Sequence, residues 1–148
     1  AANGIWGPEQ THRVNAKRGV VDLVATLKPT PELTFLLNYD WGHEEGLTPG
    51  NGSVTWQGFS GIASYSFTER CSASLRGEWF EDPNGARTGV KQSLWETTLD
   101  TKYLFTQHFY TRLEYRHDEG SQKVFLADST KTTHGQDILG AEFTYLFN

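Results

Sequence analysis

Two histidines and two aspartates flank the longest polar stretch of the sequence, at His117, Asp118, His134 and Asp137. A histidine positioned by a carboxylate can take a proton from water, so these residues could form a hydrolase site at the rim of a larger structure. No serine elbow and no metal-ligand spacing accompanies them. Because such residues are common in any polar rim, we expect no enzyme and keep a rim-located outer-membrane hydrolase as an alternative.

A second group with possible ligand chemistry consists of His43, Glu44 and Glu45, which could bind a divalent cation together with His12. These residues are more simply explained as solvated loop charges, so we predict no metal site. Nothing in the residue pattern implies a cofactor. Cys71 is the single cysteine, which allows no internal disulfide.

The remaining charges recur at even-numbered positions within alternating stretches of the chain. They are Asp22, Asp40, Arg76, Glu78, Glu96, Asp100, Lys102, Arg112, Glu114, Arg116 and Glu142. Unpaired charges in a dry interior cost several kcal/mol each, so this row must be wet or densely paired. If it lines a lumen, its excess of acids predicts a weak cation preference. The alternative is that the arginines only pair with glutamates of neighbouring strands and stiffen the wall.

These charges must be positioned by β-strands, because apolar residues occupy every second position between them. The last strand, residues 137–147, shows the pattern best, with Leu139, Ala141, Phe143, Tyr145 and Phe147 on one face. The same odd-numbered phase recurs in six earlier stretches, at residues 19–27, 33–41, 58–67, 71–80, 95–105 and 109–116. We therefore predict an all-β chain of about seven antiparallel strands connected up and down.

Aromatic residues and loop lengths indicate which solvent the apolar face meets. Connections alternate between short and long, and aromatics collect at both strand ends, as in barrels that cross an outer membrane. The residues predicted at the lipid interface are Tyr39, Trp41, Trp79, Trp95, Tyr103, Tyr115 and Tyr145. A soluble lipocalin-like barrel has the opposite arrangement, with an apolar interior and a charged exterior. We therefore predict a transmembrane β-barrel in the bacterial outer membrane.

Composition sets weaker limits on the class of protein. With a mean hydropathy of −0.55 and 36% hydrophobic residues, the chain has no apolar run near the ~18 residues of a spanning helix. Membrane strands give only a weak hydropathy signal, so these values do not argue against a barrel. The formal net charge of −5 offers no basic patch for a nucleic acid.

Strand parity bears on how much of a barrel the chain contains. Bacterial single-chain barrels have even strand numbers, and residues 1–18 show no sustained period. We therefore expect residues 1–18 to be an external loop or irregular lead-in, and residues 19–148 to be strands of a larger, even-stranded barrel completed by further strands or another copy. The alternative is a complete eight-stranded barrel with an irregular first strand within residues 4–15. Side chains would fill its narrow bore, as in a structural barrel or an adhesin.

Several segments resemble the C-terminal portion of an outer-membrane β-barrel porin family, namely RGVVD (18–22), LKPTPEL (27–33), LNYDWG (37–42), LEYRHD (113–118) and EFTYLF (142–147). The resemblance covers most of the chain and implies passive passage of small solutes or ions. It transfers no catalytic residues, and members of the family are longer than this chain.

The C-terminal residues also look like the signal by which outer-membrane barrels are recognised for assembly. The residues of this motif are Gly140, Phe143, Tyr145 and Phe147. We therefore expect the barrel-assembly machinery, outer-membrane lipid and small solutes as partners.

Overall fold

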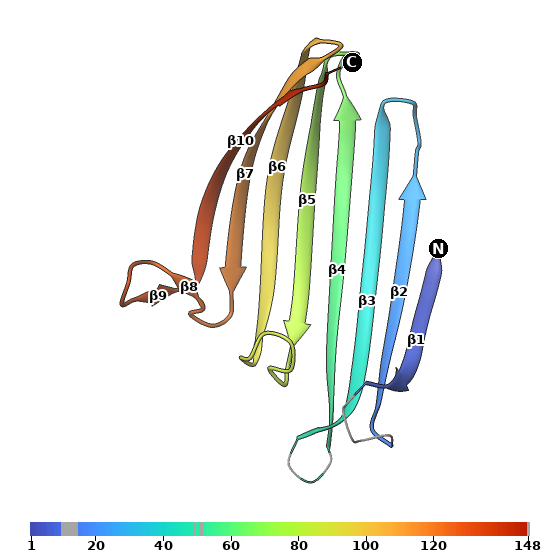
Figure 1. Ribbon diagram of the computed structural model, residues 1–148, viewed down its shortest axis with the longest axis vertical. Coiled ribbons are helices and arrows are strands. Elements are labelled where there is room, and N and C mark those ends of the chain that lie inside the picture. Colours follow the sequence, from blue (N-terminus) through green and yellow to red (C-terminus); the bar gives the residue numbers. More distant parts are fainter. Residues whose placement is uncertain (10–14, 49, 51, 148) are drawn as a thin grey trace.

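The computed structural model describes residues 1–9, 15–48, 50 and 52–147. The described residues contain no helix and form one eight-stranded antiparallel sheet in the order β1-β2-β3-β4-β5-β6-β7-β10, with a small hairpin of β8 and β9 in the last connection (Figure 1). The strands are β1 (Ala2–Pro8), β2 (Lys17–Leu27), β3 (Leu33–Thr48), β4 (Gly52–Ser66), β5 (Cys71–Asp82), β6 (Gln92–Thr106), β7 (Phe109–Gly120), β8 (Phe125–Leu126), β9 (Thr132–Thr133) and β10 (Gly135–Tyr145). This order confirms the predicted all-β, antiparallel, up-and-down connection.

The three short turns lie together at one end of the sheet (Figure 1). They share one type of side chain–backbone hydrogen bond. A threonine hydroxyl accepts a backbone N–H bond in each turn: Thr30 from Leu33, Thr68 from Cys71, and Thr106 from Phe109. Such hydroxyl-to-backbone bonds favour a tight reversal over continued strand. The longer connections therefore all fall at the opposite end.

Strand register keeps two chemically different faces separate. From β2 to β10 odd-numbered residues pair mainly with odd-numbered ones, as Leu75 does with Leu99, and even with even, as Glu78 does with Glu96. Directly opposite residues lie on the same side of a sheet. We call the odd-numbered side of these strands the apolar face and the even-numbered side the polar face.

Strand β1 corrects the prediction for residues 1–18. Ala2–Pro8 form a strand rather than a loop or irregular lead-in, and β2 begins at Lys17, before the predicted start at Gly19. The register of β1 is inverted, since Trp6 pairs with Gly19 and lies on the apolar face although its number is even. The alternative of a first strand within residues 4–15 is closer, but part of that range, residues 10–14, lies outside the described residues.

Two predicted loops are also shorter than expected. The polar stretch 43–53 mostly continues the hairpin, because β3 extends to Thr48 and β4 begins at Gly52, with an irregular register between Glu44 and Thr48. In the last connection, β7 extends to Gly120 and β8 pairs with β9.

Burial in the sheet is the reverse of that in a soluble domain. Among the described residues, the only buried hydrophobic side chains are Val54 and Trp56, whereas Glu44, Asp82, Gln92, Glu96, Thr98 and Asp118 are buried polar ones. On the apolar face Leu75, Leu99 and Leu113 are 53%, 47% and 57% exposed. The apolar residues therefore do not form an interior, and the Asp100 side chain on the polar face is only 14% exposed.

The sheet is open in the part of the chain that the structure describes. Strands β1 and β10 form its two edges, and each has one neighbour (Figure 1). The expected count of about seven strands is wrong, because the large sheet contains eight. An even number of strands no longer argues that strands are missing from the barrel. The two open edges indicate independently that the sheet has room for further strands. None of the described residues belongs to a helix that is long and apolar enough to span a membrane.

Candidate functional site

All the charged residues predicted to line a lumen lie on the polar face. They come from β2, β3, β5, β6, β7 and β10, at Asp22, Asp40, Arg76, Glu78, Glu96, Asp100, Lys102, Arg112, Glu114, Arg116 and Glu142. The even phase of these strands is kept through the six strand pairings from β2 to β10. It brings charged side chains that are far apart in sequence onto one surface.

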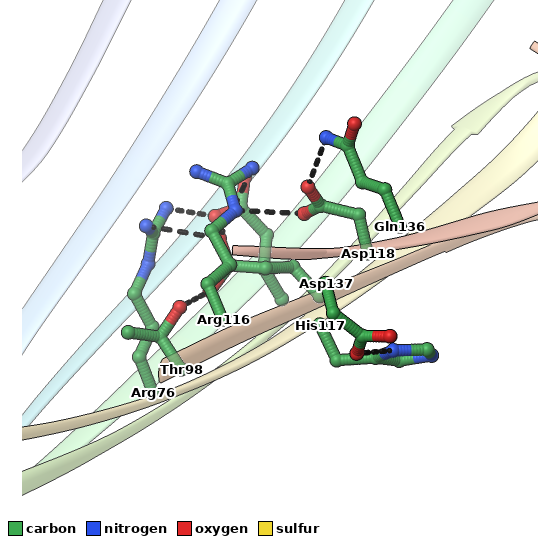
Figure 2. Close-up of polar contacts among 9 residues, drawn as sticks. Arg76, Thr98, Arg116, His117, Asp118, Gln136 and Asp137 are labelled. Atoms are coloured by element: carbon green, nitrogen blue, oxygen red, sulfur yellow. Dashed lines mark hydrogen bonds and ion pairs between the residues drawn. The ribbon is translucent and has the colours of Figure 1, made fainter. Parts of the chain in front are cut away.

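The most closely paired residues of this face lie on β5, β6, β7 and β10. We call this group the central ladder; its members are Arg76, Glu96, Arg116, Asp118 and Gln136. Glu96 Oε2 lies 3.0 Å from Arg76 Nη1 and 3.7 Å from Arg116 Nη2. Arg116 Nε lies 2.7 Å from Asp118 Oδ1, and Gln136 donates to the other oxygen of Asp118 at 2.7 Å. Figure 2 shows Asp118 between Arg116 and Gln136. Positive and negative groups therefore alternate along the ladder.

The carboxylates of the central ladder are buried but well satisfied. Glu96 is 6% exposed and also accepts a 2.5 Å hydrogen bond from Thr98, while Arg76 reaches a further carboxylate at Glu78. Buried charges persist only with partners of this kind. The arginine side chains stay more than a third exposed. They line a cavity of about 390 Å³ on the polar face.

A second group lies nearer the short turns. Arg112 bridges Asp100 at 3.1 Å and Glu142 at 3.6 Å, across three adjacent strands. Lys102 places its ammonium 4.3 Å from the ring centre of Tyr110, a cation–π contact. This group is more exposed than the central ladder and is therefore more strongly screened by solvent.

A third group lies on the strands near β1. Asp22 accepts hydrogen bonds from the amides of Asn3 at 2.7 Å and Asn38 at 2.6 Å. Asp40 is its direct cross-strand neighbour. The Asn3 contact was not predicted, because it depends on the unexpected strand β1.

An ion pair missed from the sequence extends the polar face toward the long connections. Arg18 Nε lies 2.7 Å from Glu44 Oε2, and the Glu44 side chain is 2% exposed. Both residues fell in predicted loops. Their even numbers continue the phase of the neighbouring strands, which is the signal that could have identified them.

The four candidate hydrolase residues do not converge. His117 Nδ1 lies 2.9 Å from Asp137 Oδ1 on the apolar face, and Tyr115 donates to the same oxygen at 2.7 Å. Asp118 belongs to the ladder on the other face, and His134 Nδ1 lies 2.9 Å from the backbone oxygen of Gly120. Figure 2 shows the His117–Asp137 pair apart from the ladder. The arrangement gives no support to the hydrolase alternative.

His43, Glu44 and Glu45 were considered as possible ligands of a divalent cation, and among the described residues no group of three or more His, Cys, Asp or Glu side chains could hold a metal ion. His43 instead stacks with Trp41, with ring centres 6.0 Å apart. His12 lies outside the described residues.

The aromatics predicted at a lipid interface lie on the apolar face in two bands. Because β3 and β7 extend beyond their predicted ends, Tyr39, Trp41 and Tyr115 lie near the middle of their strands. Tyr39, Trp41, Trp79, Trp95 and Tyr115 lie toward the long connections, and Tyr103 and Tyr145 toward the short turns. Neighbouring rings touch in the second band, as Tyr103 does with Phe105 at 4.8 Å. Trp6, which was missed because of the inverted phase of β1, joins the first band and is 60% exposed.

The predicted assembly motif lies on and just after β10, at the edge of the sheet. Phe143, Tyr145 and Phe147 are all exposed, and the rings of Tyr145 and Phe147 meet at 4.9 Å. Gly140 pairs with Glu114 of β7. The motif therefore leaves its aromatic side chains accessible.

Comparison with known proteins gives one family. The family model described as "Putative beta-barrel porin-2, OmpL-like" matches residues 1–147. No curated protein and no solved structure matches the chain.

Proposed function

The chain belongs to this family of β-barrel porins, and we propose that it forms the wall of an outer-membrane barrel through which small solutes or ions pass passively. The observation that carries the proposal is the inverted burial of the sheet, in which leucines are exposed and carboxylates are buried. The predicted membership in a porin family is confirmed by the match, which covers nearly the whole chain.

The spacing of the aromatic bands supports contact with lipid. On β6 the outward residues run from Trp95 to Tyr103, a separation of eight residues. At about 3.4 Å per residue this is ~27 Å along the strand, and ~20 Å across the membrane for a strand tilted by about 40°. This span is close to the ~25 Å apolar band of known outer-membrane barrels.

The polar face supports contact with water inside the wall. The charges of the central ladder alternate in sign, and the arginine side chains remain accessible beside a cavity. Passive conduction requires a lining that binds ions only weakly, and charges already paired within the wall fit this requirement. Acidic side chains outnumber basic ones among the charged residues named above, so we propose a weak preference for cations.

The open edges support further strands in the wall. In lipid every unsatisfied backbone donor or acceptor costs several kcal/mol, so the free edges of β1 and β10 need partners. We propose that additional strands, from the same protein or from another copy, complete a barrel wide enough to conduct. Closure of β1 directly on β10 would instead give a narrow eight-stranded barrel filled by side chains.

The exposed motif on and after β10 supports recognition during insertion. We propose that the barrel-assembly machinery recognises Gly140, Phe143, Tyr145 and Phe147. The rings of the three aromatic residues are exposed on or just after an edge strand whose backbone can still pair.

Single-channel recording in planar lipid bilayers tests the proposed passage. We expect stepwise, ohmic conductance in KCl and a reversal potential on the cation side under a KCl gradient. If protein that inserts normally into the bilayer never conducts, the proposal of a pore is wrong and the narrow structural barrel is favoured. An anion-side reversal potential would overturn only the cation preference.

A further inference from the structure

The connection between β5 and β6, residues 83–91, is held in a fixed shape by one carboxylate. The Asp82 side chain is fully buried and accepts 2.8 Å hydrogen bonds from the backbone N–H groups of Ala86, Arg87 and Thr88. The Thr88 hydroxyl donates to the same side chain at 3.0 Å. Although burial raises the pKa of Asp82, these hydrogen bonds outweigh burial and hold the pKa below its usual value.

Two further features fix this connection, which we call the Arg87 loop. Gly85 and Gly89 have φ values of 70° and 81°, a region in which side chains are disfavoured. A Cβ atom on Gly85 would also lie 3.0 Å from the Val90 backbone. Asn84 accepts a hydrogen bond from the Thr55 backbone at 3.2 Å, which ties the loop to β4.

The result of this folding is a guanidinium group held over a tryptophan. Arg87 Cζ lies 4.7 Å from the ring centre of Trp56, and Trp56 is 7% exposed. The ring can lie against β3 because position 42 is glycine, where a Cβ atom would lie 2.0 Å from it. A cation–π contact with the ring leaves N–H groups of the guanidinium that can still donate hydrogen bonds. Arg87 itself is exposed.

The cavity beside Arg87 contains few other uncompensated charges. It has a volume of about 330 Å³ on the polar face, and its lining includes Arg18, Asp40, Glu78, Phe80 and Arg87. Arg18 is paired with Glu44, and Glu78 with Arg76. Within the described ranges the Arg87 side chain has no ion pair, so the cavity combines one available cation, one carboxylate at Asp40 and an apolar wall at Phe80.

We propose that this cavity binds small monovalent organic carboxylates with an apolar or aromatic body. The planar guanidinium matches a carboxylate through two parallel N–H bonds, and Phe80 supplies contact for the body of the solute. The Asp40 carboxylate disfavours a doubly charged anion such as phosphate more than a singly charged one. A volume near the lower end of ligand pockets, roughly 300–1,000 Å³, suits a small molecule. The inference rests on the proposed function, because it names a solute that binds at one local site in the proposed passage. The weak preference for cations concerns small inorganic ions over the whole polar face.

Calorimetric titration of the protein in detergent tests the site, with benzoate, the neutral isostere benzamide, and inorganic phosphate as probes. We expect benzoate to bind at least tenfold more tightly than either other probe. Arg87→Gln should weaken benzoate binding at least tenfold, and Arg87→Lys should weaken it less. Arg70→Gln, in an exposed short turn at the other end of the sheet, should change nothing. Equal binding of benzoate and benzamide, tighter binding of phosphate, or full binding by Arg87→Gln would overturn the site.

Bilayer recordings separate this inference from the proposed function. We expect benzoate to interrupt the KCl current of the wild-type protein, and to interrupt the current of Arg87→Gln at least tenfold less often at the same concentration. A KCl current that benzoate leaves unchanged would overturn the inference while the pore stands. Benzoate binding by a protein that carries no current would overturn the pore while the binding site stands.

Discussion

The two faces of this sheet are made by the same strands, yet they select opposite side chains. On the apolar face, Leu75 and Leu99 pair across strands and remain half exposed. Three residues before Leu99 on the same strand, Glu96 is buried among arginines on the polar face. A soluble sheet would reverse this distribution, because apolar area is stabilised by leaving water and isolated charges are not.

The contrast teaches that burial alone does not identify the core of such a molecule. The ordered part of the polar face is a network of ion pairs, whereas the apolar face is a surface without a protein partner in the described residues. The stability of the sheet therefore depends on the medium that contacts its apolar face. The predictions below substitute residues of one face or of one loop and compare the effects between regions.

The largest effect is expected from a charge on the apolar face. Leu75→Arg should lower the free energy of unfolding from lipid vesicles by about 2–4 kcal/mol, because a guanidinium would then lie near the bilayer midplane. Urea titration in vesicles measures this change. Ser60→Arg is the matched control, since Ser60 lies opposite Glu78 on the polar face and should be near neutral. Equal effects of the two substitutions would remove the distinction between the faces.

Breaking the central ladder should have the next largest effect. Glu96→Gln removes the negative charge between Arg76 and Arg116, and we expect a loss of ~2–3 kcal/mol in the free energy of unfolding because two cations then face each other beside a buried amide. The same titration in vesicles measures the loss. Because the arginine side chains are partly exposed, solvent should limit the loss. A loss well above this range would mean that less water reaches these side chains than their exposure indicates.

The Arg87 loop provides a smaller and pH-dependent test. The pKa of Asp82 is lowered in the folded protein, so its stabilisation is complete above the unfolded value of about 3.9 and is lost as pH falls through the lower folded value. Asp82→Asn should speed hydrogen exchange at the amides of residues 86–88 about tenfold at neutral pH, equivalent to ~1.4 kcal/mol.

Exchange at these amides in the wild-type protein, corrected for intrinsic rates, should remain slow at pH 4 and accelerate only at lower pH. Amides in the middle of β6 serve as the internal reference. Acceleration already between pH 6 and 5 would contradict a lowered pKa for Asp82.

The smallest effect is expected at the exposed end of the polar face. Glu142→Gln removes a 3.6 Å contact with Arg112 and should change the free energy of unfolding by less than about 1 kcal/mol, since both side chains are nearly half exposed. If the polar face borders an ion path, the same substitution should shift the reversal potential toward anions. A large loss of stability with no shift would assign Glu142 to structure alone.

Most of the sheet could be predicted from sequence because its signal is local. Alternation with a period of two determines which side chains share a face. It assigns Thr97, Leu99 and Thr101 to one face of their strand, and Glu96 and Asp100 to the other, without any knowledge of distant residues. The charged set on the polar face followed from the same rule. Individual ion pairs did not, because cross-strand partners depend on register.

The features that were missed do not appear as a regular alternation with a period of two. Strand β1 contains Gly4, Gly7 and Pro8 and has an inverted phase, so its alternation is weak and out of step with the rest. The Arg87 loop depends on positive φ values and on the buried Asp82 carboxylate. Of the four candidate hydrolase residues, His117 and Asp137 lie 2.9 Å apart, whereas His134 contacts the backbone oxygen of Gly120.

Gly42 has a consequence for the size of the proposed passage. Because it has no side chain, the indole of Trp56 lies flat against β3 rather than projecting across the polar face. Any larger residue at position 42 would push this ring away from β3 and, in the proposed barrel, reduce the aqueous cross-section. A missing methyl group in the wall would thus set part of the electrical resistance of the channel.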